Sequence, residues 1–419
     1  MKVIKRIYKD ILGALCFLIV LIVINACKKT TKDPVETENP PQEKPFAFVH
    51  PGLLHTQKDF DRMKAKVAAG AQPWKAGWEV LIANSHASLN YKPNPTVKII
   101  RGGGTIEEPM GDNYTRAYND AAAAYQLALR WKISGDDAYA AKTVEILNAW
   151  ATTCTGISGD SNAYLASGLY GYQFANAAEI VRSYSGWSAA DFTKFKNFMV
   201  EVFYKRSLDF LTRHNGTCSS HYWTNWDACN MSTVLAIGVL CDDQDMFNKA
   251  VTYFKSGIGM GNINNAVYVI FPGNLGQGQE SGRDQGHATL NISLLGAFCQ
   301  MACNQQEDLF AYSGSRFLAL CEYTAKYNLG EDVPYTPYRN CENTYQTVVS
   351  PDGRGAIRPC WELVYNHYVN VKGLQAPYSK RFAEKVRPEG GGGNYGGNSG
   401  GFDQLGFGTL TTTMDPVTP

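Results

Sequence analysis

The chain has 419 residues, with 39 lysines and arginines against 38 aspartates and glutamates, for a formal net charge of +1. This balance provides no general attraction to nucleic acid or to an anionic membrane surface, and it argues against both as partners. An anionic ligand would have to be held by a few locally placed cations instead.

The first residues have the pattern of an export signal. The basic stretch MKVIKRIYKD precedes the apolar run ILGALCFLIVLIVI, which leads into Asn25, the small residue Ala26 and Cys27. A basic region followed by an apolar region is typical of a secretory signal, and a small residue before a cysteine is typical of a lipidation site. We predict a signal peptide over residues 1–27 with lipidation at Cys27. A plain transmembrane anchor is the alternative, because the run is nearly long enough to span a bilayer.

The next segment, KKTTKDPVETENPPQEKP, is polar and rich in proline. We predict a flexible tether over residues 28–45 that links the lipidated cysteine to a folded domain over residues 46–419. The chain is then expected to be an exported lipoprotein of the outer membrane, at the cell surface or the periplasmic face. The lipid anchor would be its contact with the membrane.

From residue 117 onward the chain is dominated by helical periodicity, with apolar residues three and four positions apart. Residues 117–153 show this pattern with one break at Ser134-Gly135-Asp136, which predicts two antiparallel helices joined by a tight turn. Further helices are predicted within 172–184, 191–211, 228–258, 288–305 and 313–329.

A long series of helical hairpins favours either an α-solenoid or a closed α/α toroid. No internal repeat of fixed period is visible, which argues against a regular solenoid. We therefore predict an all-α fold, a single large (α/α) toroid domain in the form of an incomplete barrel of helical hairpins, and we expect a monomer.

Nine cysteines follow the predicted signal, so at least one thiol must stay unpaired within the chain. A disulfide between Cys341 and Cys360 is one pairing to consider. Cysteines and histidines do not cluster at the spacing of a zinc site, so we expect neither a metal nor a cofactor.

The stretch QESGRDQGHATLN at 279–291 is denser in polar and ionisable groups than core packing requires. Arg283 and His287 are four residues apart, so on a helix both side chains would project from the same face. The functional interpretation is a cationic clamp and a base at the start of a helix. The structural alternative is that Arg283 pairs with Glu280 or Asp284 and that His287 is a satisfied helix residue.

The segment TNWDACNMSTVLAIGVLCDDQDMFNKAV resembles the catalytic-helix segment of alginate lyases with an α/α-toroid fold. Read backward from Asp245-Met246-Phe247, Asn225 falls on the asparagine of that family, and Trp226 replaces its histidine. Counted from the helix around Ala297-Phe298, His287 falls on the family's catalytic tyrosine. The resemblance extends more loosely to HPGLLHTQKDFDRMKAKV and to the 118–140 hairpin. The signal and the GRDQGH stretch are similar to polysaccharide lyase family thirty-eight of gut Bacteroidetes.

The resemblance implies a lyase that cleaves 4-O-linked uronic acid polymers by β-elimination. Such an enzyme must neutralise the C6 carboxylate, remove the C5 proton and protonate the leaving O4. Asn225 and Arg283 suit the first task, and His287 suits the second, because the ordinary histidine pKa of about 6.5 leaves it able to accept a proton near pH 7. Alginate is the first candidate substrate, and glucuronan or another glucuronate polymer is the alternative. From other classes, a toroid glycoside hydrolase using Glu280, Asp284 and Asp227, or a surface glycan-binding lipoprotein, stays open.

The acid for O4 has two candidates, Tyr365 and Tyr222, between which the sequence does not decide. His221 could neutralise the carboxylate in place of the missing family histidine. Gly102-Gly103-Gly104 could form a lid or a plain connection. Contacts with the sugar are expected from Gln279, Glu280, Trp226, His367, Tyr368, Tyr118, Arg116 and Tyr170.

Overall fold

The computed structural model describes residues 47–103, 111–393 and 402–416. The predicted signal peptide, the lipidation site Cys27, the tether and Gly104 of the predicted lid therefore lie outside the described residues. Within the described ranges, no helix combines the length and the apolar character that crossing a bilayer requires.

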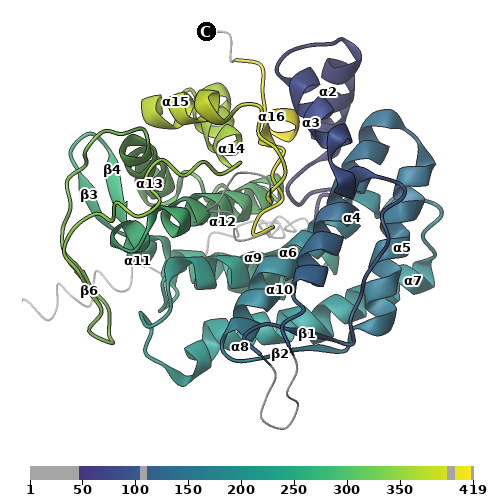
Figure 1. Cartoon of the computed structure of the whole chain (residues 1–419), viewed down its shortest axis with the longest axis horizontal. Coiled ribbons are helices and arrows are strands. Elements are labelled where there is room, and N and C mark those ends of the chain that lie inside the picture. The colour runs from purple at the N-terminus through teal and green to yellow at the C-terminus, as the bar shows by residue number, and fades with distance from the viewer. Residues whose placement is uncertain (1–46, 104–110, 394–401, 417–419) are drawn as a thin grey trace, which may run out of the picture. The chain divides into compact units, whose positions relative to one another are not determined.

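Fifteen α-helices follow one another along the described residues (Figure 1). They are α2 (Gln57–Ala68), α3 (Trp74–Ala83), α4 (Thr115–Ser134), α5 (Asp137–Thr153), α6 (Asn162–Val181), α7 (Ala189–Phe198), α8 (Lys205–Arg213), α9 (Thr224–Leu240), α10 (Gln244–Ser256), α11 (Ile263–Ala266), α12 (Gln285–Asn304), α13 (Tyr312–Asn328), α14 (Trp361–Tyr365), α15 (Pro377–Val386) and α16 (Gly408–Thr411). A 3₁₀ turn, η4 (Gln279–Gly282), precedes α12, and a π-helical segment, η5 (Asn366–Val371), continues α14.

Four of these helices, α4, α6, α9 and α12, pack side by side in that order and form an inner layer. An outer helix packs against three of them: α5 on α4, α10 on α9 and α13 on α12. Figure 1 shows these hairpins arranged around a common centre. The predicted all-α fold, an incomplete ring of helical hairpins, is confirmed.

The inner helices are buried on nearly all sides, as expected for helices without a polar face. Gly168 and Gly171 on α6 allow the close approach of α9: a Cβ added at these positions would lie 2.4 Å from Cys229 Sγ and 2.6 Å from Thr233 Cγ2. At the predicted turn between α4 and α5, Gly135 has a φ of +77°, and the Asp136 side chain accepts a hydrogen bond from the N–H of Ala138 at 3.0 Å. The antiparallel pair predicted there is present.

The described residues also form three two-stranded sheets, which the helical periodicity did not predict. They are parallel β1 (Lys98–Ile100) with β2 (Gly156–Ser158), antiparallel β3 (Val267–Phe271) with β4 (Leu275–Gly278), and antiparallel β5 (Tyr338–Arg339) with β6 (Tyr345–Gln346). The β3–β4 hairpin turns through Gly273 and Asn274, both at positive φ. Strand β4 leads directly into η4 and α12, so the hairpin helps to position these two elements.

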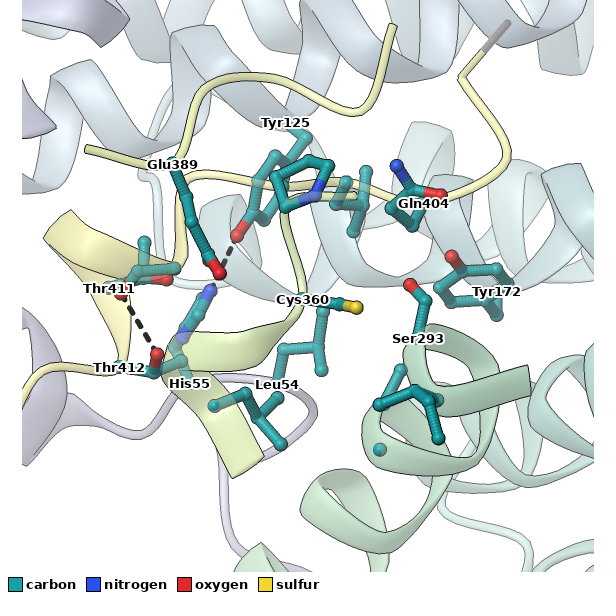
Figure 2. A pocket seen from close by; sticks show the side chains of 18 residues that line it. Leu54, His55, Tyr125, Tyr172, Ser293, Cys360, Glu389, Gln404, Thr411 and Thr412 are labelled. Carbon is teal, nitrogen blue, oxygen red and sulfur yellow. Dashed lines mark hydrogen bonds between the residues drawn. The ribbon is translucent and has the colours of Figure 1, made fainter. Parts of the chain in front are cut away.

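The segment after α15 returns to the ring and is held there by buried carboxyl groups. The Glu389 carboxyl oxygen Oε1 accepts hydrogen bonds from the backbone N–H groups of Trp361 at 2.7 Å and Glu362 at 2.9 Å. Figure 2 shows Glu389 lining a small internal pocket together with His55 and Tyr125. Desolvation by burial, and next the negative charge of Glu362, raise the pKa of Glu389 to about 8.

Replacing Glu389 by glutamine is expected to make the protein less sensitive to alkaline pH. Because the folded pKa is raised above the ordinary 4.5, the stabilisation from the bound proton is fully present below that value. It is lost as the pH rises through about 8. Glutamine keeps an acceptor for the two N–H groups and does not ionise. The Tm of the wild type should therefore fall more than that of Glu389→Gln between pH 5 and pH 9 in thermal unfolding scans. Equal falls in both proteins would contradict the expectation.

Candidate active site

The N-termini of α9 and α12 meet beside η4, and side chains of η4 cap α9. Gln279 Oε1 accepts hydrogen bonds from the backbone N–H of Thr224 at 2.8 Å and from its hydroxyl at 2.9 Å. The first N–H groups of a helix lack partners within the helix, so these bonds fix where α9 begins. Gln279 itself is fully buried. It supports the site from inside, and the predicted contact between Gln279 and sugar is not available to its buried side chain.

Glu280 holds two of the predicted catalytic residues together. Its carboxylate accepts hydrogen bonds from the backbone N–H of Asn225 at 2.9 Å, from Asn225 Nδ2 at 2.9 Å and from Arg283 Nη1 at 2.8 Å. Glu280 is fully buried, whereas the Arg283 side chain is 27% exposed. The predicted role of Glu280 as a sugar contact is therefore corrected: it positions Asn225 and Arg283 from behind.

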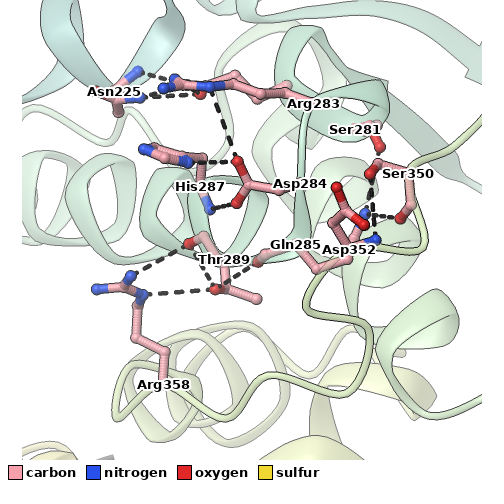
Figure 3. A network of polar contacts seen from close by, with 12 residues as sticks. Asn225, Ser281, Arg283, Asp284, Gln285, His287, Thr289, Ser350, Asp352 and Arg358 are labelled. Carbon is pink, nitrogen blue, oxygen red and sulfur yellow. Dashed lines mark hydrogen bonds and ion pairs between the residues drawn. The ribbon is translucent and has the colours of Figure 1, made fainter. Parts of the chain in front are cut away.

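Asp284 and His287 form a hydrogen-bonded pair at the start of α12 (Figure 3). Asp284 Oδ1 accepts the His287 backbone N–H at 2.8 Å, and Asp284 Oδ2 lies 2.6 Å from His287 Nδ1. Burial opposes the charge on Asp284, but the hydrogen bonds and charge of His287 outweigh it, so the pKa of Asp284 lies below its ordinary value. A carboxylate at Nδ1 holds the tautomer whose Nε2 is unprotonated, and the ring is 39% exposed. His287 Nε2 is thus available as a base.

The pairings that the structural alternative required in the 279–291 stretch are present, and the functional interpretation stays a prediction. Arg283 does pair with Glu280, and His287 is bonded to its helix cap, as the structural alternative required. These contacts also place Asn225, Arg283 and His287 in one cluster, which Figure 3 shows. The Arg283 guanidinium further lies 5.1 Å from the ring centre of Trp223, which restricts its orientation.

A disulfide borders the cluster. It joins Cys218 to Cys341, so the pairing of Cys341 with Cys360 is wrong; Cys360 is a buried free thiol. The disulfide fixes the loop before α9 to the β5–β6 hairpin, and nearby His221 Nδ1 lies 3.2 Å from Glu342 Oε1. Among the described residues, the metal-ligand side chains that lie close enough together to hold an ion are this cysteine pair and Glu342. The two sulfurs are already bonded to each other there, so the group does not fit a metal.

Tyr222 and Trp226 pack against each other at 4.7 Å between ring centres. The Tyr222 ring is buried, and its hydroxyl accepts a hydrogen bond from Asn215 Nδ2 at 3.2 Å. Trp226 is half-buried in the same aromatic cluster as Phe210. These contacts give both residues a packing role beside Asn225.

A second group of predicted residues lies around Arg101, which was not among the predicted site residues. Arg101 Nη1 donates a hydrogen bond to the Tyr170 hydroxyl at 3.0 Å, and its guanidinium lies 4.8 Å from the ring centre of Tyr114. Tyr118 packs edge-on against Tyr170 at 6.2 Å. Tyr170 is buried, so Tyr118 and Arg101, both half-buried, are the members of this group that a ligand can reach.

Four other predicted residues do not join the cluster. Tyr365, His367 and Tyr368 belong to α14 and η5, where Tyr368 donates to the carbonyl of Phe310 at 3.0 Å and the His367 ring stacks on Phe310. His367 lines a hollow with Gln300 and Asn304, near the C-terminal end of α12, about 20 Å along that helix from His287. Arg116 lines a separate surface hollow with His86 and Lys92.

The carboxylates considered for hydrolysis are also committed elsewhere. Glu280 and Asp284 make the bonds described above, and Asp227 is buried, accepting hydrogen bonds from the N–H of Gly261 at 2.8 Å and the hydroxyl of Tyr253 at 3.1 Å. This arrangement does not leave two carboxyl groups facing each other across a bond, as a glycoside hydrolase needs.

Comparison with known proteins finds one family. The sequence model of the alginate lyase family matches residues 80–333. No curated protein matches the chain.

Solved structures share the fold. An alginate lyase from Bacteroides ovatus superposes with a TM-score of 0.59 at 13% identity, covering 88% of this chain and 100% of that one. Alginate lyase A1-III from Sphingomonas species A1 gives a TM-score of 0.57 at 13% identity, covering 90% of this chain and 100% of that one. A variant of A1-III complexed with a tetrasaccharide gives a TM-score of 0.56 at 13% identity, covering 85% and 94% of the two chains.

Proposed function

Because this chain belongs to the alginate lyase family, we propose that it cleaves a 4-O-linked uronate polymer by β-elimination, with alginate as its first candidate substrate. One observation carries the assignment of residues: the Asn225–Arg283 pair, held by buried Glu280, lies beside a histidine whose Nδ1 is held by Asp284. A donor pair next to a base is the arrangement that removal of a proton α to a carboxylate requires.

In the proposed reaction the Arg283 guanidinium donates to the C6 carboxylate of the bound uronate. The Asn225 amide is 2% exposed and donates Nδ2 to Glu280, so it joins Arg283 at the carboxylate by exchanging one of these bonds for one to the substrate. Negative charge that develops on this group as the C5–H bond breaks is then stabilised by donors already in place. His287 Nε2 accepts the C5 proton and becomes an imidazolium, which Asp284 stabilises. Where C5–H and O4 share one face of the ring, the same imidazolium returns the proton to O4 as the C4–O4 bond breaks.

His221 is the proposed additional cation near the carboxylate. Its Nδ1 lies 3.2 Å from Glu342, and the side chain is 37% exposed on the loop that precedes Asn225. The disulfide between Cys218 and Cys341 holds this loop in place.

The test is ultraviolet absorbance of unsaturated uronate products on polymannuronate, polyguluronate and glucuronan, measured with a chelator present. We expect a steady rise on at least one polymer. New reducing ends without absorbance would instead favour hydrolysis, and tight oligosaccharide binding without any product would favour a glycan-binding protein.

Further, we propose that the chain is an exported, monomeric lipoprotein of the outer membrane, anchored through Cys27. The basic and apolar pattern before Ala26-Cys27 supports this, and similarity of the GRDQGH stretch favours polysaccharide lyase family thirty-eight. Incorporation of a labelled fatty acid that persists in Cys27→Ser would contradict the anchor.

A further inference from the structure

A short C-terminal segment, Phe402–Leu405, crosses from α12 to α4 and α6, and we call it the strap. Its backbone is tied to α6, because the Phe402 carbonyl accepts from Gln173 Nε2 at 2.7 Å and the Asp403 carbonyl accepts from the Tyr172 hydroxyl at 3.1 Å. Figure 1 shows this yellow segment reaching the centre of the ring. The strap therefore adds a wall to the inner layer that carries the proposed site.

The strap is also tied to the start of α12. The Gln404 side chain accepts a hydrogen bond from Arg358 Nη1, and Arg358 Nη2 donates to the carbonyl of Gly286 at 3.2 Å. Gly286 directly precedes His287. On the opposite side, the Phe402 ring packs against Tyr118 at 5.8 Å. The strap thus lies between the His287 side of the site and the Arg101–Tyr118 side.

Asp403 brings a carboxylate to this position. The Asp403 side chain is 6% exposed, and Arg358 Nη1 lies 3.9 Å from Asp403 Oδ2, too far for a hydrogen bond. Burial raises the pKa of Asp403, while the charges of Arg358, Arg101 and His287 act to lower it. Desolvation raises the pKa of Tyr118 most, and the charges of Tyr114 and then Asp403 raise it further.

We infer that Asp403 is a specificity-determining residue, which sets the charge that the strap side of the site presents to substrate. The proposal rests on the uronate-lyase function proposed above. One uronate carboxylate binds at Asn225 and Arg283, and a second carboxylate on a neighbouring sugar meets the negative charge of Asp403. A neutral neighbouring sugar meets no such repulsion. The strap therefore discriminates between a continuous polyuronate and a polymer in which uronates alternate with neutral sugars.

Asp403→Asn tests this with little change of shape, because the strap is held by its carbonyls and by Gln404. The variant removes the repulsion between the Asp403 charge and the second sugar carboxylate, which solvent partly screens. It should raise kcat/KM on a uronate homopolymer by roughly 3- to 30-fold by lowering KM. The value on an alternating uronate–neutral polymer should change less than about twofold. Asp332→Asn, which removes an equal charge at a 95% exposed side chain, should change neither value and serves as the matched control.

Three outcomes would overturn the inference. Equal gains on both polymers would mean a general charge effect, no change on either would mean a structural role, and a collapse of kcat at constant KM would place Asp403 in the chemistry. Absence of lyase products from the wild type would be failure of the proposed function instead. In that case, binding of a mannuronate tetrasaccharide to the wild type and to Asp403→Asn is compared by affinity electrophoresis. Asp403→Asn should still bind several-fold tighter than the wild type.

Discussion

His287→Ala is expected to lower kcat on the cleaved polymer by roughly 10²- to 10⁴-fold, the usual contribution of a positioned general base. The loss should be visible as a slower rise of unsaturated-product absorbance at saturating substrate. KM should change little, because Asn225 and Arg283 still bind the carboxylate. Stability should also change little: the His287 side chain is 39% exposed, and its backbone N–H keeps the bond to Asp284.

Tyr365→Phe is the matched control for this prediction. Its hydroxyl was a candidate proton donor, but α14 packs on the middle of α12, where Leu363 lies against Gly296, about 14 Å along the helix from His287. The variant should therefore retain wild-type kcat. If absorbance survived in His287→Ala and vanished in Tyr365→Phe, the assignment of the base to α12 would be wrong.

Glu280→Gln is expected to reduce kcat/KM by roughly 10- to 100-fold although Glu280 touches no substrate. Glutamine keeps one oxygen for the Asn225 N–H but gives up the charge and the second acceptor oxygen, so the Asn225 amide and Arg283 lose their shared anchor. Displacement of a reacting group by about 1 Å can cost two orders of magnitude. Glu280→Ala should in addition destabilise the fold by about 2–4 kcal/mol, because it leaves buried donors unpaired.

Glu322→Gln separates the loss of positioning from the loss of stability. Glu322 is also buried and accepts hydrogen bonds from two backbone N–H groups at a helix start, those of Tyr378 at 3.0 Å and Ser379 at 2.8 Å. Glu280→Gln and Glu322→Gln each remove a buried charge that holds N–H groups at a helix start, so both should lower the Tm in thermal unfolding. The kcat/KM of Glu322→Gln should stay at the wild-type value. Equal kinetic losses in both variants would show that general loosening, rather than the Asn225–Arg283 anchor, governs activity.

The parts of the fold and site that were predictable are those set by local spacing. Apolar residues three and four positions apart in the sequence predicted α4, α5, α9, α12 and α13, because an α-helix brings such positions onto one face. Asn225 and His287 each stand in the first turn of a helix, and two helix starts that meet can bring such residues together. The grouping of Asn225, Arg283 and His287 follows from that.

What sequence could not provide depends on contacts between distant segments. Glu280 looks like a sugar ligand in a polar loop, and its burial is known only once α9 lies against η4. The pairing of Cys218 with Cys341 depends on how two loops meet. Tyr365 and Tyr368 are three residues apart and share a helical face, but periodicity does not say which part of α12 their helix contacts.

Arg101 and Asp403 were missed for a related reason. They come from opposite ends of the domain, and neither stands in a motif. A local signal existed only for the β3–β4 hairpin, where VYVIF and a Pro-Gly-Asn turn precede η4.

The strap also affects the order in which the site can form. Helices α4, α6, α9 and α12 are synthesised before Phe402–Leu405, and α2 and α3 pack with α16, which is made later still. During vectorial synthesis the ring can close its hairpins in sequence, because each helix meets a neighbour already made. Asp403 reaches the site only after the strap has packed onto the ring. A nascent chain that already contains every proposed proton-transfer residue therefore still lacks one wall of its site.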